Sequence, residues 1–244
     1  MPPALQLAKY AMRVMTLVLL LVLLTGCQSL SSTVSFARVR VIDISPDAPP
    51  IDIYQGNDAM AYNLSFGSVT SYVSMAPGSY TFTVDFAGSR QVLSSIKATF
   101  SANTQYTVLV SNPAASLRPS VLTDQGQQSL SRPPSIRLIH QAEHTGAVDV
   151  YVVPAGQRLA SVNLVVTNLV PGAATEYLAV PAGPSAVVML PAGAIPSVAR
   201  TAIHTGIQMN YVTGSARTLI LLDRQQPASP DLQVITTIDA DPAN

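Results

Sequence analysis

A histidine-rich pentapeptide is the segment of this chain that comes nearest to a metal-binding motif. His140, Glu143 and His144 spell H-x-x-E-H, an inverted zinc-protease signature that acts on a helix, where residues four apart share a face. Residues 137–139 before the motif and 148–151 after it alternate as strands do. On a turning or extended backbone the two rings would not reach one ion, so a zinc-dependent hydrolase is the least favoured function.

Three aspartates surround a proline-rich loop and could supply oxygen ligands for calcium. Asp43, Asp47 and Asp52 lie close to residues 46–50 in the sequence. Their spacing matches no known calcium loop, and Asp47 can instead form a turn with its own backbone. We therefore predict no metal site. The loop residues themselves are the first candidate contact surface for a partner, namely Ser45, Pro46, Asp47, Ala48 and Pro49.

Motifs for other catalytic chemistry are missing from the sequence. There is no G-x-S-x-G elbow, no glycine-rich phosphate loop and no C-x-x-C pair. The three histidines all lie beyond residue 139, and the only glutamates are Glu143 and Glu176. We expect a non-catalytic protein without a cofactor. Tryptophan, the commonest stacking surface for sugars, is also absent, which weakens a carbohydrate-binding alternative unless an exposed row of tyrosines replaces it.

The single cysteine is placed for lipid attachment. Cys27 follows Leu24-Thr25-Gly26 and an apolar run over residues 14–24, which is too short for a stable membrane span. This ending resembles the lipobox of bacterial lipoproteins, which implies cleavage before Cys27, a diacylglycerol on its sulfur and an acylated amino terminus. Gln28 in the next position implies the outer membrane where a cell has two. The other interpretation is a plain N-terminal helix with a chance cysteine.

Composition restricts the partners of the mature chain. Removing residues 1–26 takes away Lys9 and Arg13, which leaves 11 basic against 13 acidic side chains. This balance excludes the basic face of a nucleic-acid-binding protein. Because hydrophobic residues make up 48% of the chain and charged ones 11%, a large core is expected. A compact signal peptide could also begin at Met12, so Met12 is an alternative to Met1 as the start of translation.

Two copies of one unit can be aligned within the chain. Residues 40–54 and 137–151 align without a gap at an offset of 97. After a longer loop the offset becomes 105, and further pairs coincide in order: Tyr72 with Tyr177, Gly78 with Gly183, Ala87-Gly88 with Ala192-Gly193, and Tyr106 with Tyr211. So many coincidences in order indicate a duplication.

Each copy is predicted to be a β-sandwich. Residues 79–86 and 106–110 alternate at period two or are rich in β-branched and aromatic side chains, and proline and glycine separate such runs. The fold class is therefore all-β, with two tandem immunoglobulin-like or fibronectin-like sandwiches. Tyr106, and Tyr211 in the second copy, are candidates for a tyrosine corner, in which the phenol bonds to backbone upstream.

Four further residues recur in both copies. Asp52 and Asp149 each precede a tyrosine by two positions, Tyr54 and Tyr151, so each pair projects to one face of a strand. The recurrence indicates a structural role. We expect carboxylates that accept hydrogen bonds from backbone groups or from arginine, with Arg40 and Arg137 as candidate donors.

The sequence R-V-I-D-I-S-P-D-A-P-P-I-D-I-Y over residues 40–54, followed by Phe66-Gly67, Tyr72 and Pro77-Gly78-Ser79-Tyr80, resembles the bacterial domain of unknown function 4397. The resemblance covers residues 36–124. It implies tandem β-sandwiches in exported, lipid-anchored proteins, and no agreed activity. The second copy lacks the Ser-Pro-Asp-Ala-Pro loop.

These patterns together predict a signal peptide (1–26), a lipidated tether (27–35), a first sandwich (36–124), a linker (125–134) and a second sandwich (135–240). The predicted function is a cell-envelope protein, anchored to the membrane by lipid, that presents sandwich loops to an envelope protein or polysaccharide.

Overall fold

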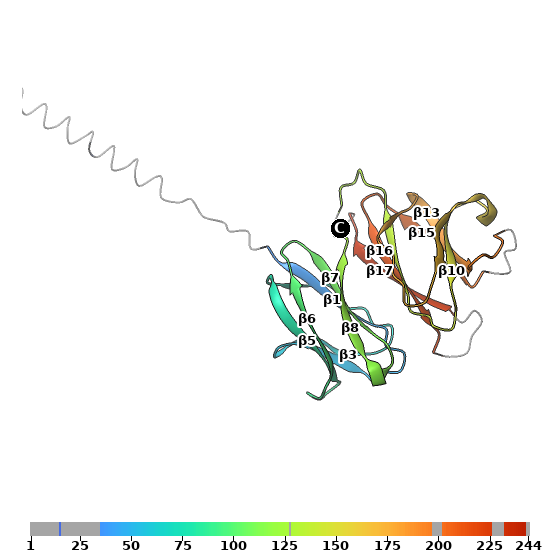
Figure 1. Ribbon diagram of the computed structural model, residues 1–244. Helices are drawn as coiled ribbons and strands as arrows, with labels where there is room; N and C mark the ends of the chain where they lie inside the picture. The colour runs from blue at the N-terminus through green and yellow to red at the C-terminus, as the bar shows by residue number, and fades with distance from the viewer. Residues whose placement is uncertain (1–14, 16–34, 127, 197–201, 226–231, 243–244) are drawn as a thin grey trace, which may run out of the picture. The chain divides into compact units, whose positions relative to one another are not determined.

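The computed structural model of the chain describes residue 15 and residues 35–126, 128–196, 202–225 and 232–242 (Figure 1). Residues 35–244 form one compact unit. The predicted signal peptide, Cys27 and all of the tether except residue 35 lie outside the described residues. In the part of the chain that is described, no helix combines the length and the apolar character needed to cross a bilayer.

The first half of this unit is a β-sandwich of two four-stranded sheets, here called sheets A and B. Sheet A has the order β4-β1-β7-β8 and sheet B the order β3-β2-β5-β6. Strands β1 and β7 run parallel, and the other neighbours run antiparallel. The strands span β1 Ala37–Asp43, β2 Ile51–Gln55, β3 Asp58–Leu64, β4 Val73–Met75, β5 Gly78–Phe86, β6 Val92–Phe100, β7 Gln105–Ser111 and β8 Arg118–Asp124, with a 3-10 turn at Ala114–Ser116.

The second half repeats this plan in sheets C and D. Sheet C has the order β12-β9-β16-β17, and sheet D joins β11, β10 and β13, with β14 and β15 both paired to β13. Strands β9 and β16 run parallel, as β1 and β7 do. The strands span β9 Ser135–His140, β10 Val148–Pro154, β11 Leu164–Leu169, β12 Leu178–Ala179, β13 Gly183–Pro191, β14 His204–Thr205, β15 Met209–Tyr211, β16 Ala216–Asp223 and β17 Leu232–Ala240, with a 3-10 turn at Leu159–Ser161.

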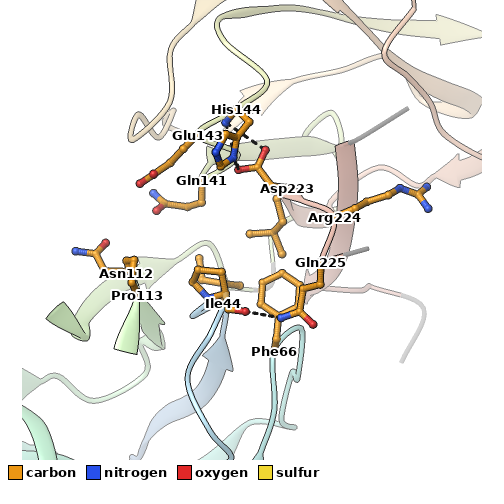
Figure 2. Close-up of a pocket in the computed structure, with 12 residues that line it drawn as sticks. Ile44, Phe66, Asn112, Pro113, Gln141, Glu143, His144, Asp223, Arg224 and Gln225 are labelled. Atoms are coloured by element: carbon orange, nitrogen blue, oxygen red, sulfur yellow. Dashed lines mark hydrogen bonds and ion pairs between the residues drawn. The ribbon is translucent and has the colours of Figure 1, made fainter. Parts of the chain in front are cut away.

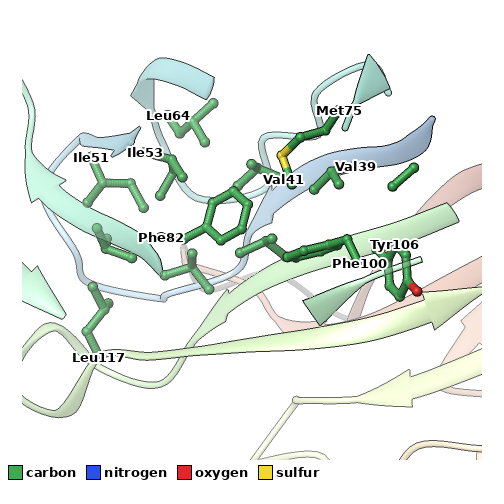
Figure 3. Packing of buried hydrophobic residues seen from close by; sticks show 14 residues of the cluster. Val39, Val41, Ile51, Ile53, Leu64, Met75, Phe82, Phe100, Tyr106 and Leu117 are labelled. Atoms are coloured by element: carbon green, nitrogen blue, oxygen red, sulfur yellow. The ribbon is translucent and has the colours of Figure 1, made fainter. Parts of the chain in front are cut away.

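Each sandwich encloses a core of its own, as the period-two pattern of the sequence predicts. Alternate residues of β1 point inward, where they meet side chains of β2, β5 and β6 from the facing sheet (Figure 3). The ring of Phe100 lies edge-on to those of Phe82 and Tyr106, with centroids 5.4 and 4.9 Å apart. Edge-to-face pairs of this kind contribute about 1 kcal/mol each beyond the area they bury. In the second sandwich Leu138, Val150 and Met189 occupy the core.

Asp52 and Asp149 hold the same turns in the two sandwiches. The carboxylate of Asp52 accepts the N–H of Asn63 at 2.7 Å and that of Gly88 at 3.0 Å. Asp149 accepts the N–H groups of Asn168 and Gly193, both at 2.8 Å. All four donors have positive φ, from 51° to 78°, where glycine and asparagine are the residues that fit with least strain.

The two tyrosines that follow these aspartates are buried. Tyr54 lies under the guanidinium of Arg90, 3.7 Å from its carbon to the ring centroid, and Tyr151 packs with Val188 and Leu190 on the outer face of sheet D. The backbone role expected of Asp52 and Asp149 is thus seen. The suggested arginine donors are wrong, because Arg40 and Arg137 bond to other aspartates.

Tyr106 makes the contact expected of a tyrosine corner. Its hydroxyl accepts the N–H of Ser101 at 3.0 Å, within the connection that carries the chain from sheet B to sheet A. Tyr211 does not match it. Tyr211 pairs with Gly183 as Phe100 pairs with Gly78, so its ring takes the place of Phe100, and its buried hydroxyl has no partner among the described residues.

The mistaken match has a simple cause. The offset between the copies changes a second time, from 105 at Gly183 to 111 at Tyr211, before β16. In the first sandwich Tyr106 pairs with Val39. Ile136 is the counterpart of Val39 in the second sandwich, and it pairs with Arg217. Arg217 is therefore the residue that corresponds to Tyr106. The chance recurrence of tyrosine at offset 105 concealed an insertion of six residues.

Candidate binding site at the junction of the two sandwiches

The proline-rich loop exposes only part of itself. Ser45 is fully buried, with its hydroxyl donating to the carbonyl of Asn112 at 2.6 Å. Ala48 packs against the core of the first sandwich. Asp47 is exposed and accepts the N–H of Ala114 at 2.7 Å, while Pro46 is also exposed. Pro46, Asp47 and Pro50 are therefore the loop residues that a partner could contact most fully.

The H-x-x-E-H motif does not form a metal site. His140 is completely buried, and its ring bonds through Nε2 to the carbonyl of Gly146 at 2.8 Å and through Nδ1 to the N–H of Ala142 at 3.2 Å. Burial lowers the pKa of His140, so the ring is held neutral. His144 points elsewhere, with its side chain 88% exposed and Nδ1 3.0 Å from Asp223. In the described residues no cluster of three potential ligands occurs.

His140 in fact performs the structural task of Asp43. Asp43 stands 97 residues earlier and accepts the N–H of Ser45 at 2.9 Å, two residues on, as His140 does with Ala142. The second carboxylate oxygen of Asp43 is buried without a hydrogen-bond partner. Desolvation raises the pKa of this carboxyl to about 6, against a smaller opposing effect of the Ser45 hydrogen bond. Asp43, Asp47 and Asp52 each accept a backbone N–H, from Ser45, Ala114 and Asn63 respectively.

The two sandwiches meet through the outer faces of sheets A and C. At the centre of this contact Arg40 of β1 donates Nε to the hydroxyl of Thr107 at 2.9 Å, Nη1 to the carbonyl of Ile238 at 3.0 Å, and Nη2 to the carboxylate of Asp239. The arginine is 2% exposed and the aspartate 3%. A guanidinium of the first sandwich is therefore buried against a carboxylate of the second.

The reverse contact is made by the corresponding residues. Arg137 of β9 donates Nε to Thr218 at 3.1 Å, Nη1 to the carbonyl of Thr123 at 3.1 Å and Nη2 to Asp124 at 2.5 Å. Each carboxylate also accepts the hydroxyl of its own sheet's threonine, Thr107 to Asp124 at 2.5 Å and Thr218 to Asp239 at 2.6 Å. Six side chains thus close a ring with an approximate two-fold relation, which we call the arginine–aspartate ring: Arg40, Thr107, Asp124, Arg137, Thr218 and Asp239.

Two tyrosines cover this ring. Tyr72 donates to Asp124 at 2.7 Å and lies 4.7 Å beneath the guanidinium of Arg40. Tyr177 donates to Asp239 at 2.8 Å and lies 4.8 Å beneath Arg137. Burial, reinforced by the neighbouring carboxylates, raises the pKa of both phenols. They therefore stay protonated and keep donating, so every group of the ring has a partner.

An apolar layer continues the contact beyond the ring. Ile42, Ile44 and Leu109 of sheet A pack with Ile139, Ile220 and Leu222 of sheet C, and Phe66 and Ile235 join them at the edge. Removing one partner of a buried ion pair leaves an uncompensated charge, which is strongly destabilising. The paired charges and the apolar layer therefore both contribute to holding the two sandwiches together.

A groove of about 540 Å³ opens where this junction reaches the proline-rich loop (Figure 2). We call it groove 1. Ile44, Pro46 and Phe66 line it from the first sandwich, and Glu143, Leu222 and Gln225 from the second. The side-chain amide of Gln225 donates to the carbonyl of Pro46 at 2.6 Å across the groove. The exposed part of the candidate loop thus forms one wall of a groove that both sandwiches build.

The charges around groove 1 are mixed. Glu143 and Asp223 place carboxylates on it, Asn112 and Gln141 place amides on it, and Arg224 lines it while its guanidinium points away (Figure 2). His144 is tied to Asp223 through both its backbone N–H, at 3.2 Å, and Nδ1, at 3.0 Å. With apolar walls and amide groups at the rim, the groove fits a neutral polar ligand such as a polypeptide better than a strongly charged one.

Sequence reasoning did not find the residues that join the sandwiches. Thr107, Asp124, Thr218 and Asp239 belong to the arginine–aspartate ring, and none was singled out. One signal was available. An arginine within a strand of apolar residues is buried only when paired, so Arg40 and Arg137 each called for a buried carboxylate, although the sequence did not show which one.

Fold and site together define an all-β protein built of β-sandwiches with a groove at their junction. Residues 37–151 match the family described as a domain of unknown function (DUF4397). The match covers the whole first sandwich and continues through β9 into β10 of the second, so that region is similar to this family. None of the curated proteins matches the chain.

Two solved structures are similar to the chain at low levels. One is a carbohydrate-binding module of family 26 from Eubacterium rectale Amy13K in complex with maltoheptaose, with 10% identity, a TM-score of 0.27, and coverage of 82% of this chain and 97% of that one. The other is a candidate cell-adhesion protein from Bacteroides uniformis, with 10% identity, a TM-score of 0.24, and coverage of 83% and 98%.

Proposed function

We propose that this chain is a non-catalytic envelope protein, anchored to the membrane by lipid on Cys27, that presents the junction of its two sandwiches to another envelope component. The observation that carries the proposal is the arginine–aspartate ring. It fixes two sandwiches into one body and so gives groove 1 a constant shape. Preformed sites of constant shape bind with a smaller cost of ordering.

The anchor is supported by the sequence around Cys27. One acyl chain gives only marginal attachment, whereas two or three on one residue hold a protein firmly, since each buried methylene contributes about 0.8 kcal/mol. The tether of residues 28–35 reaches on the order of 25 Å when extended. A partner in this setting would be another component of the same membrane or of the adjoining envelope, and Gln28 favours the outer membrane. The second sandwich would be a diverged copy of the first.

A protein partner is better supported than a polysaccharide. The carbohydrate-binding alternative predicts an exposed row of tyrosines on one sheet. Among the tyrosines that the structure describes, only Tyr62 is mostly exposed, at 66%, while Tyr54, Tyr106, Tyr151 and Tyr211 are buried. The residues around groove 1 offer amides and apolar walls instead.

Photo-crosslinking in native membranes tests the proposal. A photoreactive phenylalanine in place of the exposed Pro46 should yield a discrete crosslinked product when the lipidated protein is expressed at its natural level. The same residue in place of the exposed Asp58, in the hairpin between β2 and β3 at the opposite end of the sandwich, is the matched control. Equal yields at both positions, or no product at Pro46, would contradict presentation through this groove.

A further inference from the structure

A second groove lies next to groove 1 at the same junction. Leu109, Ser120, Leu122, Ile139 and Pro171 line a groove of about 500 Å³. It shares Asn112, Gln141 and Glu143 with groove 1, so the two open side by side at one end of the contact between sheets A and C. We call it groove 2.

The approximate two-fold relation of the sandwiches gives groove 2 a counterpart site, the part of the apolar layer beside Gly67. The N–H of Gly67 donates to the carbonyl of Asp43, and that of Gly172 to the carbonyl of His140, at 2.8 and 2.7 Å. Just beyond, Val69 forms an isolated bridge with Ile42, and Ala174 with Ile139. The residue before each glycine is therefore in the same place in the two sandwiches. It is Phe66 beside groove 1 and Pro171 beside groove 2.

At a second pair of corresponding positions, the side chain beside groove 2 is again the smaller one. Strand register places Ser120 opposite Leu109 in sheet A, and Ile235 opposite Ile220 in sheet C. Phe66 and Ile235 both pack into the apolar layer between the sandwiches. Ser120 and Pro171 are smaller and line an open groove instead. The chain thus fills one counterpart site with its own aromatic and branched side chains and leaves the other empty.

The groove left open keeps an apolar floor and a polar rim. Leu109, Leu122 and Ile139 form the floor, as the matching part of the layer does around Phe66. Asn112 and Gln141 offer amides at the rim, and Arg118 and Glu143 carry opposite charges. Amides and charges of both signs suit the N–H and C=O groups of a peptide, which need partners once they leave water.

We propose that groove 2 receives an aromatic side chain of a partner polypeptide, which takes the place that corresponds to the position of Phe66 beside Ile235 in the apolar layer. This inference rests on the proposed function, because it specifies the chemistry of the partner: an exposed phenylalanine or similar ring on a short turn. The bound ring lies against Leu109 and Ile139, and the flanking peptide groups lie along the Asn112–Gln141 rim.

The test uses a peptide that copies the chain's own filled site. Acetyl-Leu-Ser-Phe-Gly-Ser-amide reproduces residues 64–68 and is titrated into the purified mature protein in detergent micelles, with methyl NMR signals of Leu109, Leu122 and Ile139 as the readout. Saturable shifts are expected with a dissociation constant on the order of 1 mM, because one buried ring only slightly outweighs the freedom lost on binding. The peptide with alanine in place of phenylalanine should bind at least tenfold more weakly, roughly the effect of removing the ring.

Filling the groove provides the matched variant. Ser120→Ile combined with Pro171→Phe copies Ile235 and Phe66, which fill the counterpart site in the apolar layer, and should abolish the shifts without lowering the melting temperature. If the double variant does not fold, Ser120→Ile alone is used for the titration. Because residue 120 is only half-buried, this single change is expected to leave the fold intact. Absence of saturable shifts up to about 10 mM, ten times the expected constant, equal binding of the alanine peptide, or binding retained in the folded filled variant would each overturn the inference.

The crosslinking experiment separates this inference from the proposed function. A crosslink at Pro46 that persists in the filled variant, together with a failed peptide titration, removes groove 2 as the receptor site and leaves presentation by the junction standing. Peptide binding without any crosslink at Pro46 keeps groove 2 as a receptor for an aromatic side chain and removes presentation through groove 1.

Discussion

At the scale of single residues, three aspartates with different surroundings are the most informative side chains. Asp52 gives both carboxylate oxygens to backbone N–H groups, and Asp124 gives its oxygens to arginine, threonine and tyrosine. Asp43 has one oxygen buried without a partner. The first two stabilise the fold as anions, whereas burial makes the charge on Asp43 unfavourable.

The raised pKa of Asp43 predicts how stability depends on pH. Its folded-state pKa is about 6 against an ordinary 3.8, so the folded chain keeps a proton that the unfolded chain has lost. The contribution of this group is complete below pH 4 and is lost as the pH rises through 6. Asp43→Asn keeps the acceptor for Ser45 and should stabilise the protein by on the order of 2 kcal/mol at pH 7.5 and by little at pH 4.

Urea unfolding of Asp43→Asn across this pH range checks the prediction. Asp47→Asn is the control, because Asp47 is exposed and also bonds a backbone N–H. A gain from Asp43→Asn that is equal at pH 4 and pH 7.5 would contradict the assignment of the titration to this residue.

Removing Asp52 should cost more than most surface changes. Asp52→Ala leaves the N–H groups of Asn63 and Gly88 without their acceptor, each in a positive-φ turn. Two lost charge-assisted bonds predict a loss of about 2–4 kcal/mol in the free energy of unfolding. Asp149→Ala, which breaks the same two bonds in the second sandwich, should cost as much. A loss below 1 kcal/mol in both variants, the size of a surface effect, would show that water replaces the carboxylates.

At the scale of strands, the sequence predicts well which residues alternate between the two faces of a strand. It predicts poorly where one copy of the repeat contains an insertion. Inward-facing residues of β1 and β5 follow period two, and both sandwiches could be expected from that pattern. Tyr211 was assigned to the wrong strand because two tyrosines recur at the earlier offset. The arginine–aspartate ring could not be read locally, since Arg40 and Asp239 are 199 residues apart and their meeting depends on which sheet faces pack together.

The ring makes a prediction about coupling between strands of different sandwiches. Arg40→Ala leaves Asp239 buried with one donor fewer and should cost about 3–5 kcal/mol. Replacing both partners, Arg40→Met with Asp239→Leu, should recover a large part of that loss, because no unpaired charge remains. A double-mutant cycle by chemical unfolding measures this coupling. Lys97→Ala is the control, since Lys97 is an exposed cation on β6 of the first sandwich. Additive effects at Arg40 and Asp239 would contradict the ring.

At the scale of the whole molecule, every part of the proposed role depends on where the chain is held. In the proposed role, the lipid on Cys27 holds the junction and its two grooves at a membrane surface. Without that anchor, the grooves would not be concentrated there.

Intact-mass measurement of the protein purified from membranes of a bacterial host tests this central claim most directly. The account predicts a chain that begins at Cys27 and is heavier than residues 27–244 by a diacylglycerol and one further acyl chain, and a Cys27→Ser variant that keeps its leader. A mature mass with unmodified sulfur, or a wild-type chain that retains residues 1–26, would contradict lipid anchoring and with it presentation at the envelope.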